Sequence, residues 1–531
     1  SDLPEVRSPS HSLKAHKQEN TMSVAMLVYT NKVAKAGSVK KKRSFDGRQN
    51  IGALIINDAL ERAGHPVKFC SPETAHHHKI VLVSFTSLND YFNFLQNVHK
   101  WKTWRRGERT FKVIAGGAGM QTVAPVREYV DYAVFGRGEF IAPKLVDAIL
   151  KGKEFVHPAV MPDLMNPSIV KYEQVEGVYE HEIQMAEGVF KETVSGCPMF
   201  CSFCHYTFAR KWEGRHDESG SGKKATDYVR RGTYGGALEG IMSTIAGALP
   251  EASMADQRRI VTGIDGFSQR LRYAIRKRIS DQDIIDTIEE SSIASDFDPT
   301  HFKMFQIAGY PTETEEDRYE FEENLRKIKR QKDGNRIMIS VHVTPFQASP
   351  LSPSAWLPVN FDTEWRSKLK GKDIIGADKM AVGEQRDVVI FYDRYIETEM
   401  SHFKVMVMAR ATDESDEIIN RLIYDKTLKK LKSKYAMEYL KNKHDISQYS
   451  REYHTTEEQI PSWYLRSYIG NDSMIKSAQL VKAALGMPEA GMKKGLQYDT
   501  PVEGEPDFGP KEQVEQKKRF TMSEGQMVEV A

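Results

Sequence analysis

Three of the chain's four cysteines lie within eight residues of one another, and this cluster constrains the fold more than any other feature of the sequence. Cys197, Cys201 and Cys204 have the spacing Cys-x3-Cys-x2-Cys. Three thiolates on one tight loop can bind three irons of a cubane 4Fe-4S cluster. The fourth iron then has no protein ligand, and an open coordination position is what the binding of a substrate to a metal requires. The spacing therefore predicts a 4Fe-4S cluster with one iron open to a small molecule.

A zinc site or a purely structural cluster is the alternative interpretation of the same residues. Zinc usually has four ligands in proteins, and His205 would be the fourth. His205 directly follows Cys204, however, which strains a tetrahedral site, and no second pair of cysteines exists elsewhere. The remaining cysteine, Cys70, follows an apolar run and is expected to be buried and inert. We favour the iron–sulfur interpretation.

The clustering of the cysteines also indicates the compartment. A secreted disulfide scaffold would spread its cysteines along the chain, so we expect a cytoplasmic protein in reducing surroundings. The net charge of +2 argues against a chain that coats nucleic acid nonspecifically. No run of about 18 apolar residues occurs, so we expect no membrane span. Residues 1–22 lack the apolar core of a signal peptide and are expected to be a disordered tail.

Short apolar runs alternate with helical patterns over residues 23–152, which indicates α/β architecture with a parallel sheet. The expected strands are the five runs 24–29, 66–69, 80–85, 111–115 and 132–135. The expected helices span residues 51–63 before a C-cap at Gly64, 90–102 and 141–150. Glycine-rich turns follow the last two strands, at the edge where such sheets bind ligands. We predict an N-terminal doubly wound, Rossmann-like domain.

The rest of the chain divides into four further parts. Residues 153–186 contain proline and few periodic runs, so we expect a linker. Residues 187–358 again alternate strand and helix patterns. Residues 359–490 are predicted to form a mostly helical C-terminal domain, in which 413–439 is one long, charged helical stretch. Residues 491–531, rich in Gly, Pro, Glu and Lys, are expected to be a disordered tail.

The segment from Cys197 to Cys204 resembles the signature of the radical S-adenosylmethionine (SAM) superfamily. In that signature an aromatic residue directly precedes the last cysteine and packs near the SAM adenine, and Phe203 has this position. The resemblance implies that SAM binds the open iron through its amino and carboxylate groups. An electron from a flavodoxin- or ferredoxin-type reductant then breaks a sulfur–carbon bond of SAM and releases a 5′-deoxyadenosyl radical. The resemblance also implies that residues 187–358 form a partial (β/α) barrel.

Three further segments resemble strand ends that bind SAM in the subgroup with an N-terminal cobalamin-binding domain. They are 263–272 with Lys277, 307–314, and 344–346 with the prolines and Trp356 that follow. By this resemblance the SAM contacts are expected to come from Phe203, Gly263, Ser268, Arg270 and Gly309. Families of this kind usually hold the SAM amino group with a Gly-Gly-Glu motif. Only residues 235–239 have a similar composition here, with shifted spacing, and they offer Gly236 and Glu239 as candidates.

The order of elements over residues 23–152 resembles the cobalamin-binding domains of the same subgroup. The positions that contact the corrin ring and the nucleotide tail in such domains are occupied by Ser84, Gly116, Gly117, Gly136 and Gly138. Glycines allow a backbone to approach a flat cofactor closely. The Asp-x-His-x-x-Gly motif, whose histidine binds cobalt in other cobalamin proteins, is absent. The alternative is a domain that keeps the fold and no longer binds cobalamin, because the bulky Phe85, Tyr91 and Phe92 lie near the expected cofactor face.

These features support three functions. The first, which we favour, is a cobalamin-dependent methyltransferase reaction at an unactivated carbon. The second is a radical rearrangement, as in an isomerase, or a modification of a nucleotide or nucleic-acid base, without cobalamin. Basic segments such as Lys40–Arg43 and Arg105-Arg106, with Trp101 and Trp104 nearby, motivate it. The third is a non-enzymatic iron–sulfur protein. The substrate, a small molecule or a nucleic acid, and the oligomeric state stay open.

Two remaining groups of residues are ambiguous in the sequence. The run His76-His77-His78 lies between two expected strands without a carboxylate nearby, and we expect an exposed turn rather than a metal site. Trp463, Tyr464 and Arg466 either help to select the substrate or belong to the core.

Overall fold

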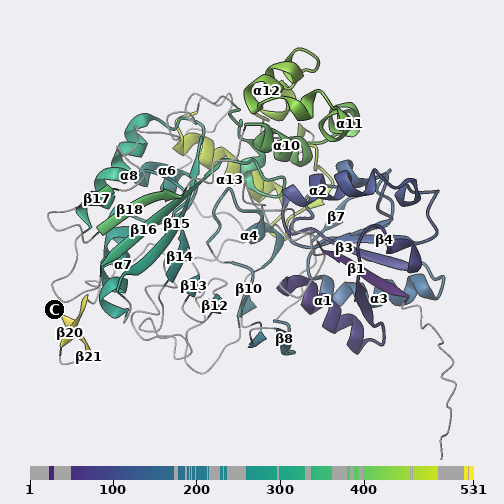
Figure 1. Cartoon of the computed structure of the whole chain (residues 1–531), viewed down its shortest axis with the longest axis horizontal. Coiled ribbons are helices and arrows are strands. Elements are labelled where there is room, and N and C mark those ends of the chain that lie inside the picture. Colours follow the sequence, from purple (N-terminus) through teal and green to yellow (C-terminus); the bar gives the residue numbers. More distant parts are fainter. Residues whose placement is uncertain are drawn as a thin grey trace, which may run out of the picture.

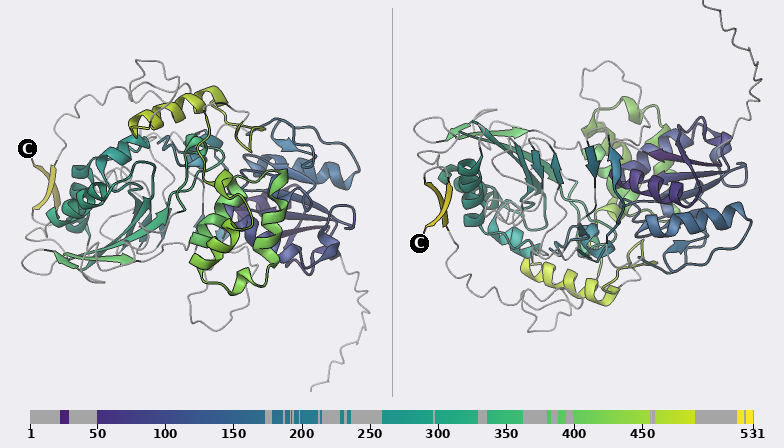
Figure 2. Two further views of the ribbon diagram at one scale, coloured as in Figure 1. Left: turned by 90° about the horizontal axis from the view of Figure 1, so that it is seen from above. Right: turned by 90° about the horizontal axis from the view of Figure 1, so that it is seen from below.

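The computed structural model of the chain contains two main sheets and a group of helices that packs between and beside them (Figures 1 and 2). The structure describes residues 23–28, 50–172, 178–185, 188–190, 192, 194–197, 199–211, 213–214, 228–230, 233–235, 259–295, 298–328, 336–361, 380–382, 388–393, 399–454, 456, 459–487, 519–523 and 526–530. Among these residues no helix is long and apolar enough to cross a membrane.

The first sheet has the strand order β2-β1-β3-β4-β5-β6. Its parallel strands are β1 (Val24–Val28), β2 (Val67–Phe69), β3 (Ile80–Ser84), β4 (Lys112–Gly116) and β5 (Tyr132–Val134). All five predicted strands are thus present, with ends shifted by at most one residue. The order reverses direction at β1, which is the switch point that characterises doubly wound sheets.

Alternate residues of these strands point to opposite faces, and each face is covered. Val24, Met26 and Val28 pack with the helices α1 (Ile51–Arg62) and α3 (Gly138–Leu150). Ala25 and Leu27 face the other side, where α2 (Leu88–Val98) contributes to a larger cluster. A parallel sheet buried on both faces explains why the sequence runs here are continuously apolar. The Rossmann-like architecture predicted for this region agrees with the strand order and the two covered faces.

Part of the segment expected to be a linker joins the folded structure. β6 (Val160–Met161) pairs antiparallel with β5 at the edge of the first sheet. β7 (Val170–Lys171) pairs with β19 (Leu465–Arg466), which lies almost 300 positions later in the sequence. These two-residue strands are too short to produce a periodic pattern, so their pairing is not visible in the sequence.

The second sheet has seven strands in the order β12-β13-β14-β15-β16-β18-β17. Its central strands are the parallel β13 (Thr233–Gly235), β14 (Arg259–Gly263), β15 (Thr300–Ala308), β16 (Ile337–Pro345) and β18 (Val388–Asp393). The edge strands β12 (Tyr228–Arg230) and β17 (Met380–Val382) are antiparallel to their neighbours. The helices α7 (Asp281–Ala294) and α8 (Glu315–Lys327) pack on one face through a separate hydrophobic cluster.

The sheet does not end where the sequence suggested. The predicted boundary at residue 358 separates β16 from β18, yet β18 pairs with β16 over six residues, from Ile337 with Val388 to His342 with Asp393. The alternating region therefore extends beyond its predicted C-terminal limit. The described strands form a run from β12 to β17 in which only β17 and β18 exchange places relative to their sequence order.

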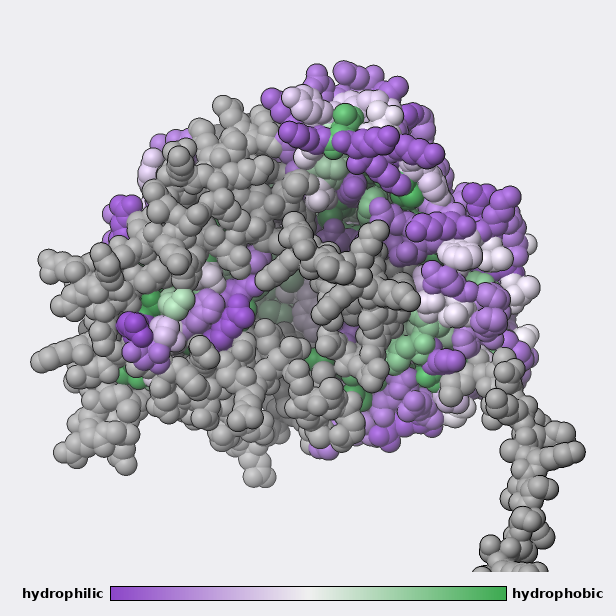
Figure 3. Space-filling view, in the orientation of Figure 1, coloured by the Kyte–Doolittle hydropathy of each residue, from purple (hydrophilic) through white to green (hydrophobic). Residues whose placement is uncertain are grey.

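The helical part contains α10 (Glu399–Ala409), α11 (Asp416–Tyr424), α12 (Ser433–Lys441) and α13 (Asn471–Ala484). The predicted single stretch 413–439 is in fact a 3-10 turn, α11, a second 3-10 turn and most of α12. The break has a local cause, because the Asp425 carboxylate accepts hydrogen bonds from the backbone N–H groups of Thr427 and Leu428. Figure 3 shows mostly hydrophilic residues on the surface over α11 and α12.

The last described segment also differs from expectation. β20 (Arg519–Ser523) and β21 (Gln526–Val530) pair as an antiparallel hairpin within the region predicted to be a disordered tail. Residues 1–22 and 491–518 lie outside the described residues.

A comparison of two glycines tests how closely the loops of the first sheet pack. Gly117 and Gly107 both have left-handed backbone angles, with φ of 103° and 92°. A Cβ atom at Gly117 would lie 2.3 Å from the Phe85 carbonyl oxygen, whereas one at Gly107 would meet nothing within 4 Å.

We predict that Gly107→Ala costs about 1 kcal/mol of unfolding free energy. Gly117→Ala should cost about 1–3 kcal/mol more, because the backbone of the neighbouring loop must move. Denaturant unfolding followed by circular dichroism compares the two, and equal losses would contradict the close packing.

Candidate functional site

The cysteine loop lies between β10 (Val194–Ser195) and the short helix α4 (His205–Ala209). Two residues in it have left-handed backbone angles, Gly196 with φ of 78° and Phe200 with φ of 50°. Such an angle is rare for a bulky residue and marks a backbone that the surroundings enforce. Phe200 is buried and packs edge-to-face on Phe208, with ring centroids 5.8 Å apart. The buried phenylalanine thus anchors a tightly curved loop.

Two of the three sulfur atoms have hydrogen-bond donors from the loop and from the start of α4. The Cys197 sulfur accepts from the backbone of Met199 and the hydroxyl of Thr207. The Cys204 sulfur accepts from the backbone N–H groups of Tyr206 and Thr207, at the start of α4. Donors of this kind stabilise sulfur ligands that carry negative charge and tune the potential of iron–sulfur clusters.

Burial governs the protonation of these thiols. It raises the pKa of Cys197 to about 11 and raises the pKa of Cys201 and Cys204 as well. Cys204 acts electrostatically on Cys197, and both act on Cys201, so the loop gathers the three thiols in one place. Buried thiols become thiolates when a metal supplies the compensating positive charge. The donor set therefore fits three irons of a 4Fe-4S cluster.

The zinc alternative is not supported by the placement of His205. Its ring hydrogen-bonds to the backbone of Ala118, in the glycine-rich loop after β4, and burial lowers its pKa to about 4. Among the described residues no three His, Cys, Asp or Glu side chains are grouped closely enough to bind a single metal ion. Zinc would therefore lack a fourth protein ligand in the described part of the chain.

The strand ends of the second sheet lie beside the cysteine loop. The hydroxyl and backbone N–H of Ser202 both donate to the carbonyl of Ile275, at distances of 3.1 and 2.9 Å. Beyond Ile275, Lys277 forms an ion pair with Asp265, which follows β14 and has a φ of 60°. The charge of Lys277 acts on all three thiols, and that of Asp265 acts on Cys201 and Cys204. The sequence segment that resembles a SAM-binding strand end is thus adjacent to the predicted cluster ligands.

Two tyrosines complete the surroundings of the loop. The Tyr310 hydroxyl donates to the Asp265 carbonyl at 2.9 Å, and its pKa is raised by burial and by the charges of Asp265 and Cys201. Burial and the charge of Cys197 raise the pKa of Tyr468. Tyr468 was not a sequence candidate, because it lies more than 260 positions after the cysteines and within no motif.

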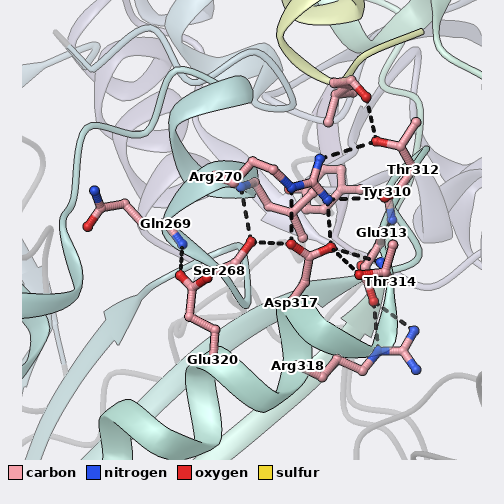
Figure 4. A network of polar contacts seen from close by, with 12 residues as sticks. Ser268, Gln269, Arg270, Tyr310, Thr312, Glu313, Thr314, Asp317, Arg318 and Glu320 are labelled. Carbon is pink, nitrogen blue, oxygen red and sulfur yellow. Dashed lines mark hydrogen bonds and ion pairs between the residues drawn. The ribbon is translucent and has the colours of Figure 1, made fainter.

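Two of the predicted SAM contacts belong to a polar network between α6 (Gln269–Ala274) and α8, shown in Figure 4. The Ser268 hydroxyl caps α6 and donates to Asp317 at 2.5 Å. Arg270 donates to the same carboxylate at 2.6 Å and to the Thr312 carbonyl at 3.1 Å. Burial alone would raise the pKa of Asp317, but the hydrogen bonds from Arg270 and Ser268 lower it below its usual value. The network fixes the segment after β14 relative to the segment after β15.

The other predicted SAM contacts are distributed around the same region. The N–H of Gly309 donates to Glu313 at 2.7 Å, and Gly309 has a φ of 84°. Gly263 lies so close to its own turn that a Cβ atom would come within 2.6 Å of the Asp265 carboxylate. Phe203 is partly buried against the large hydrophobic cluster. The SAM contacts of these residues stay predictions, and Gly236 and Glu239 lie outside the described residues.

The glycines predicted to approach cobalamin approach the chain itself. A Cβ atom at Gly119 would lie 2.4 Å from the backbone nitrogen of Ser87, and Gly117 is equally close to Phe85. At Gly138 the neighbour is the side chain of Ile56, at 2.9 Å. Gly136 has a φ of 108°, whereas a Cβ atom at Gly116 would meet only ordinary contacts. Ser84 ends β3. Internal packing among the described residues therefore accounts for two of the four predicted glycines, Gly117 and Gly138, and for the neighbouring Gly119.

The aromatic side chains near this edge belong to the core. Phe85 is buried and stacks on Tyr91 with ring centroids 4.6 Å apart. The Tyr91 hydroxyl donates to the Thr122 carbonyl at 2.8 Å. Tyr464 is also buried, and its hydroxyl accepts from the backbone N–H of Val123 at 2.7 Å. Tyr464 thus joins the helical part to the first sheet, so its alternative interpretation as a core aromatic is the correct one.

A buried group of charges, which the sequence did not reveal, connects the first sheet to both sides of the cysteine loop. Arg137 forms ion pairs with Glu139 and with Glu192, the second at 2.8 Å. The side chains of all three are at most 9% exposed. Glu192 also accepts from the backbone N–H of Tyr179 at 2.6 Å, and both glutamates act electrostatically on Arg210. Glu192 precedes the cysteine loop and Arg210 follows it, so we call these residues the charge clamp.

Several other expectations are settled by burial. Cys70 is buried, which raises its pKa to about 12, as expected for an inert thiol. His76 and His77 lie in an exposed 3-10 turn, as expected. Trp104 was proposed to stack on bases, which is wrong, because it is buried and its indole nitrogen donates to the Pro72 carbonyl at 2.9 Å. Trp101 is 40% exposed. The basic run 40–43 lies outside the described residues.

Comparisons with known proteins find similar solved structures but no match by sequence. No family model and no curated protein matches the chain. Among the similar solved structures are three of the cobalamin-dependent S-adenosylmethionine radical enzyme OxsB. The apo structure has 9% identity and a TM-score of 0.40, and the match covers 86% of this chain and 84% of OxsB. The structure with aqua-cobalamin has 11% identity and a TM-score of 0.37, covering 80% and 72%.

The third structure, with aqua-cobalamin and S-adenosylmethionine bound, has 12% identity and a TM-score of 0.36, and the match covers 67% of this chain and 56% of OxsB. OxsB belongs to the class of enzyme that the cysteine motif resembles. Because all three TM-scores are below 0.5, the assignment of function depends on the residues described above.

Removal of Arg137 tests the charge clamp. Arg137→Met leaves Glu139 and Glu192 buried without their cation, and we expect a loss of about 3–5 kcal/mol of unfolding free energy. The matched control is Arg106→Met, because Arg106 forms a 2.7 Å ion pair with Asp163 in which the two side chains are 34% and 41% exposed. Such a surface pair contributes less than about 1 kcal/mol. Denaturant unfolding measures the free energy of unfolding of both variants. Similar losses would show that the charge clamp stabilises the fold no more than a surface ion pair does.

Proposed function

We propose that this chain is a radical SAM enzyme that binds a 4Fe-4S cluster through Cys197, Cys201 and Cys204. The observation that carries the proposal is the position of these three thiols, of which Cys201 is buried and the other two are partly exposed, beside the Asp265–Lys277 ion pair at the strand ends of the second sheet. Cys197, Cys201 and Cys204 would hold the cluster, which when bound would supply the electron for cleavage of S-adenosylmethionine into methionine and a 5′-deoxyadenosyl radical. A flavodoxin- or ferredoxin-type protein is the proposed electron donor.

The residues of the chain perform three tasks in this proposal. The buried loop keeps water from the thiols, and its N–H groups bind the sulfur atoms. Lys277 places a positive charge near the thiolates, which favours their ionised form. Asp265 holds Lys277 through their ion pair. The Arg270–Asp317 network keeps the strand ends fixed relative to each other, so that a bound substrate would meet a preorganised site.

We further propose, as the more specific function, a cobalamin-dependent methylation of an unactivated carbon. The support is the reversed strand order of the first sheet, whose glycine-rich edge touches the cysteine loop through Ala118 and His205. A cofactor held at that edge would be close to the site where SAM is cleaved.

A cobalamin-independent radical reaction is the second candidate, and a specific observation favours it. Gly117 and Gly119 approach the backbone at Phe85 and Ser87 so closely that their lack of side chains serves internal packing. A sheet edge closed in this way would keep the architecture of a cobalamin domain without the cofactor. The reaction would then be a rearrangement or the modification of a nucleotide or base.

Anaerobic reconstitution of the cysteine variants tests the cluster. We expect about four irons per chain in the wild type and in Cys70→Ala, because Cys70 is buried away from the loop. Cys197→Ala, Cys201→Ala and Cys204→Ala should each lose most of the iron and form no 5′-deoxyadenosine from SAM and dithionite. Iron analysis and chromatography measure the two quantities. A variant that lacks one of these three thiols yet still produces 5′-deoxyadenosine at the wild-type rate would overturn the assignment.

Reconstitution with hydroxocobalamin separates the two reactions. Methylation requires stoichiometric cobalt after desalting, measured by metal analysis and by the visible absorption of the corrin. Iron near four per chain without cobalt would refute the methylation proposal and leave the radical SAM assignment in place.

A further inference from the structure

One stretch of the helical part concentrates positive charge. Residues 426–443 contain seven lysines and one carboxylate, Glu438, which gives a net charge of +6, whereas the whole chain has a net charge of +2. The stretch includes the 3-10 turn η7 (Leu428–Lys430) and α12, which is labelled in Figure 1. All seven lysines are exposed. We call the first six of them the lysine surface: Lys426, Lys429, Lys430, Lys432, Lys434 and Lys441.

The charge of the lysine surface is not neutralised within the described part of the chain. No described carboxylate forms an ion pair with any of its six lysines. The ion pairs nearby join Arg421 to Glu417 and to Asp425 instead. The Asp425 carboxylate also accepts hydrogen bonds from the backbone N–H groups of Thr427 and Leu428. The lysine surface therefore presents its full positive charge to the solvent, where it can attract an anion.

A neighbouring cation shows that the charges in this region repel one another. Lys404, on α10, is partly buried, and its ammonium lies 4.5 Å from the centroid of the Phe92 ring. Burial lowers the pKa of Lys404, and the positive charge of Lys429 lowers it further. An anion bound beside Lys429 would offset this repulsion. The surroundings of Lys404 thus favour negative charge at this place.

Aromatic side chains are interspersed with these lysines. Tyr424 and Tyr435 are 46% and 56% exposed, so their rings are open to solvent. Tyr435 directly follows Lys434 on α12, and Lys441 lies two turns further along the same side of the helix, about 10 Å from Lys434. Cations that alternate with accessible rings are typical of surfaces that bind single-stranded nucleic acid, because the cations contact phosphates and the bases stack on the rings.

Other polyanions fit this surface less well. A helix that binds a membrane surface needs an exposed apolar side, whereas the apolar residues Ala436, Met437 and Leu440 of α12 are buried. Lysine is depleted in interfaces between proteins, so an acidic protein matches six lysines poorly. A duplex keeps its bases paired and stacked on one another, where exposed tyrosines do not reach their faces. A single strand can use both the lysines and the rings.

We propose that the lysine surface, together with Tyr424 and Tyr435, binds single-stranded nucleic acid. The phosphates would contact the lysines, and unpaired bases would stack on the tyrosine rings. Neither contact involves a metal cluster or S-adenosylmethionine, so this inference goes beyond the radical SAM function and does not rest on it. The partner is defined by its chemistry, a flexible chain of phosphates with accessible bases, which RNA and DNA share.

Fluorescence anisotropy of labelled RNA and DNA strands of about 20 nucleotides, free of secondary structure, tests the proposal on the reconstituted full-length protein. Both strands should bind with micromolar dissociation constants at low salt. A triple variant, Lys429→Met with Lys430→Met and Lys434→Met, should bind about tenfold or more weakly. Its plot of log affinity against log salt should be shallower by about 2, because each phosphate contact to a single strand contributes about 0.7.

Two controls separate a local site from a general effect of charge. The triple variant Lys68→Met with Lys144→Met and Lys153→Met removes the same charge from exposed positions beside the first sheet and should bind like the wild type. Tyr435→Ala should weaken binding at least about fivefold without changing the salt dependence, because a stacked base is lost. Tyr435→Phe keeps the ring and should restore the wild-type affinity.

Four results would overturn the inference. Neither strand might bind at about 100 µM protein. Both lysine triples could weaken binding equally, which would show a response to net charge alone. Tyr435→Ala could bind like the wild type while a duplex competes as well as the single strand. Phosphatidylserine vesicles could bind through the lysine surface while the strands do not. Failure of the radical SAM function is distinguished from all four, because it would appear as missing iron or missing 5′-deoxyadenosine while strand binding persists.

Discussion

Three thiols that share one buried loop are stable as neutral groups and become metal ligands only when positive charge compensates their ionisation. Most of the surrounding structure serves this condition. Phe200 holds the backbone in a left-handed turn, the start of α4 directs N–H groups to Cys204, and Lys277 supplies a cation. The strand ends of the second sheet and the edge of the first sheet both contact this loop, so the two sheets are arranged around it.

The sequence predicted the elements whose residues carry their own signals. The five strands of the first sheet are continuous apolar runs, and the helix before Gly64 ends where that residue adopts a φ of 83°. α8 begins directly after Thr314, whose capping box with Asp317 is a signal carried by neighbouring residues. The cysteine spacing identified the candidate cluster because all three ligands lie on one loop, where the chemistry requires no long-range information.

Features that depend on distant residues could not be predicted. Arg137 and Glu192 are 55 positions apart, and Ser268 and Asp317 are 49 positions apart, so no local pattern relates them. The pairing of β18 with β16 crosses an apparent boundary, because a composition change does not limit which strands pair. The glycine-rich loop resembles a cofactor-binding motif in sequence, yet Gly117 and Gly119 lie against their own chain. A glycine in a sequence indicates that some group approaches the backbone closely, but it does not show which group that is.

The large hydrophobic cluster has a consequence for how the molecule behaves as a whole. It is continuous from Val81 in the first sheet through Phe208 beside the cysteines to Phe403 and Leu480 in the helical part. Regions that share one core lose their stability together, so the divisions visible in the sequence are not units of folding. A fragment cut at any of them would expose the apolar surface that its neighbour covers. The geometry of the metal-binding loop therefore depends on distant parts of the chain that pack in the same core.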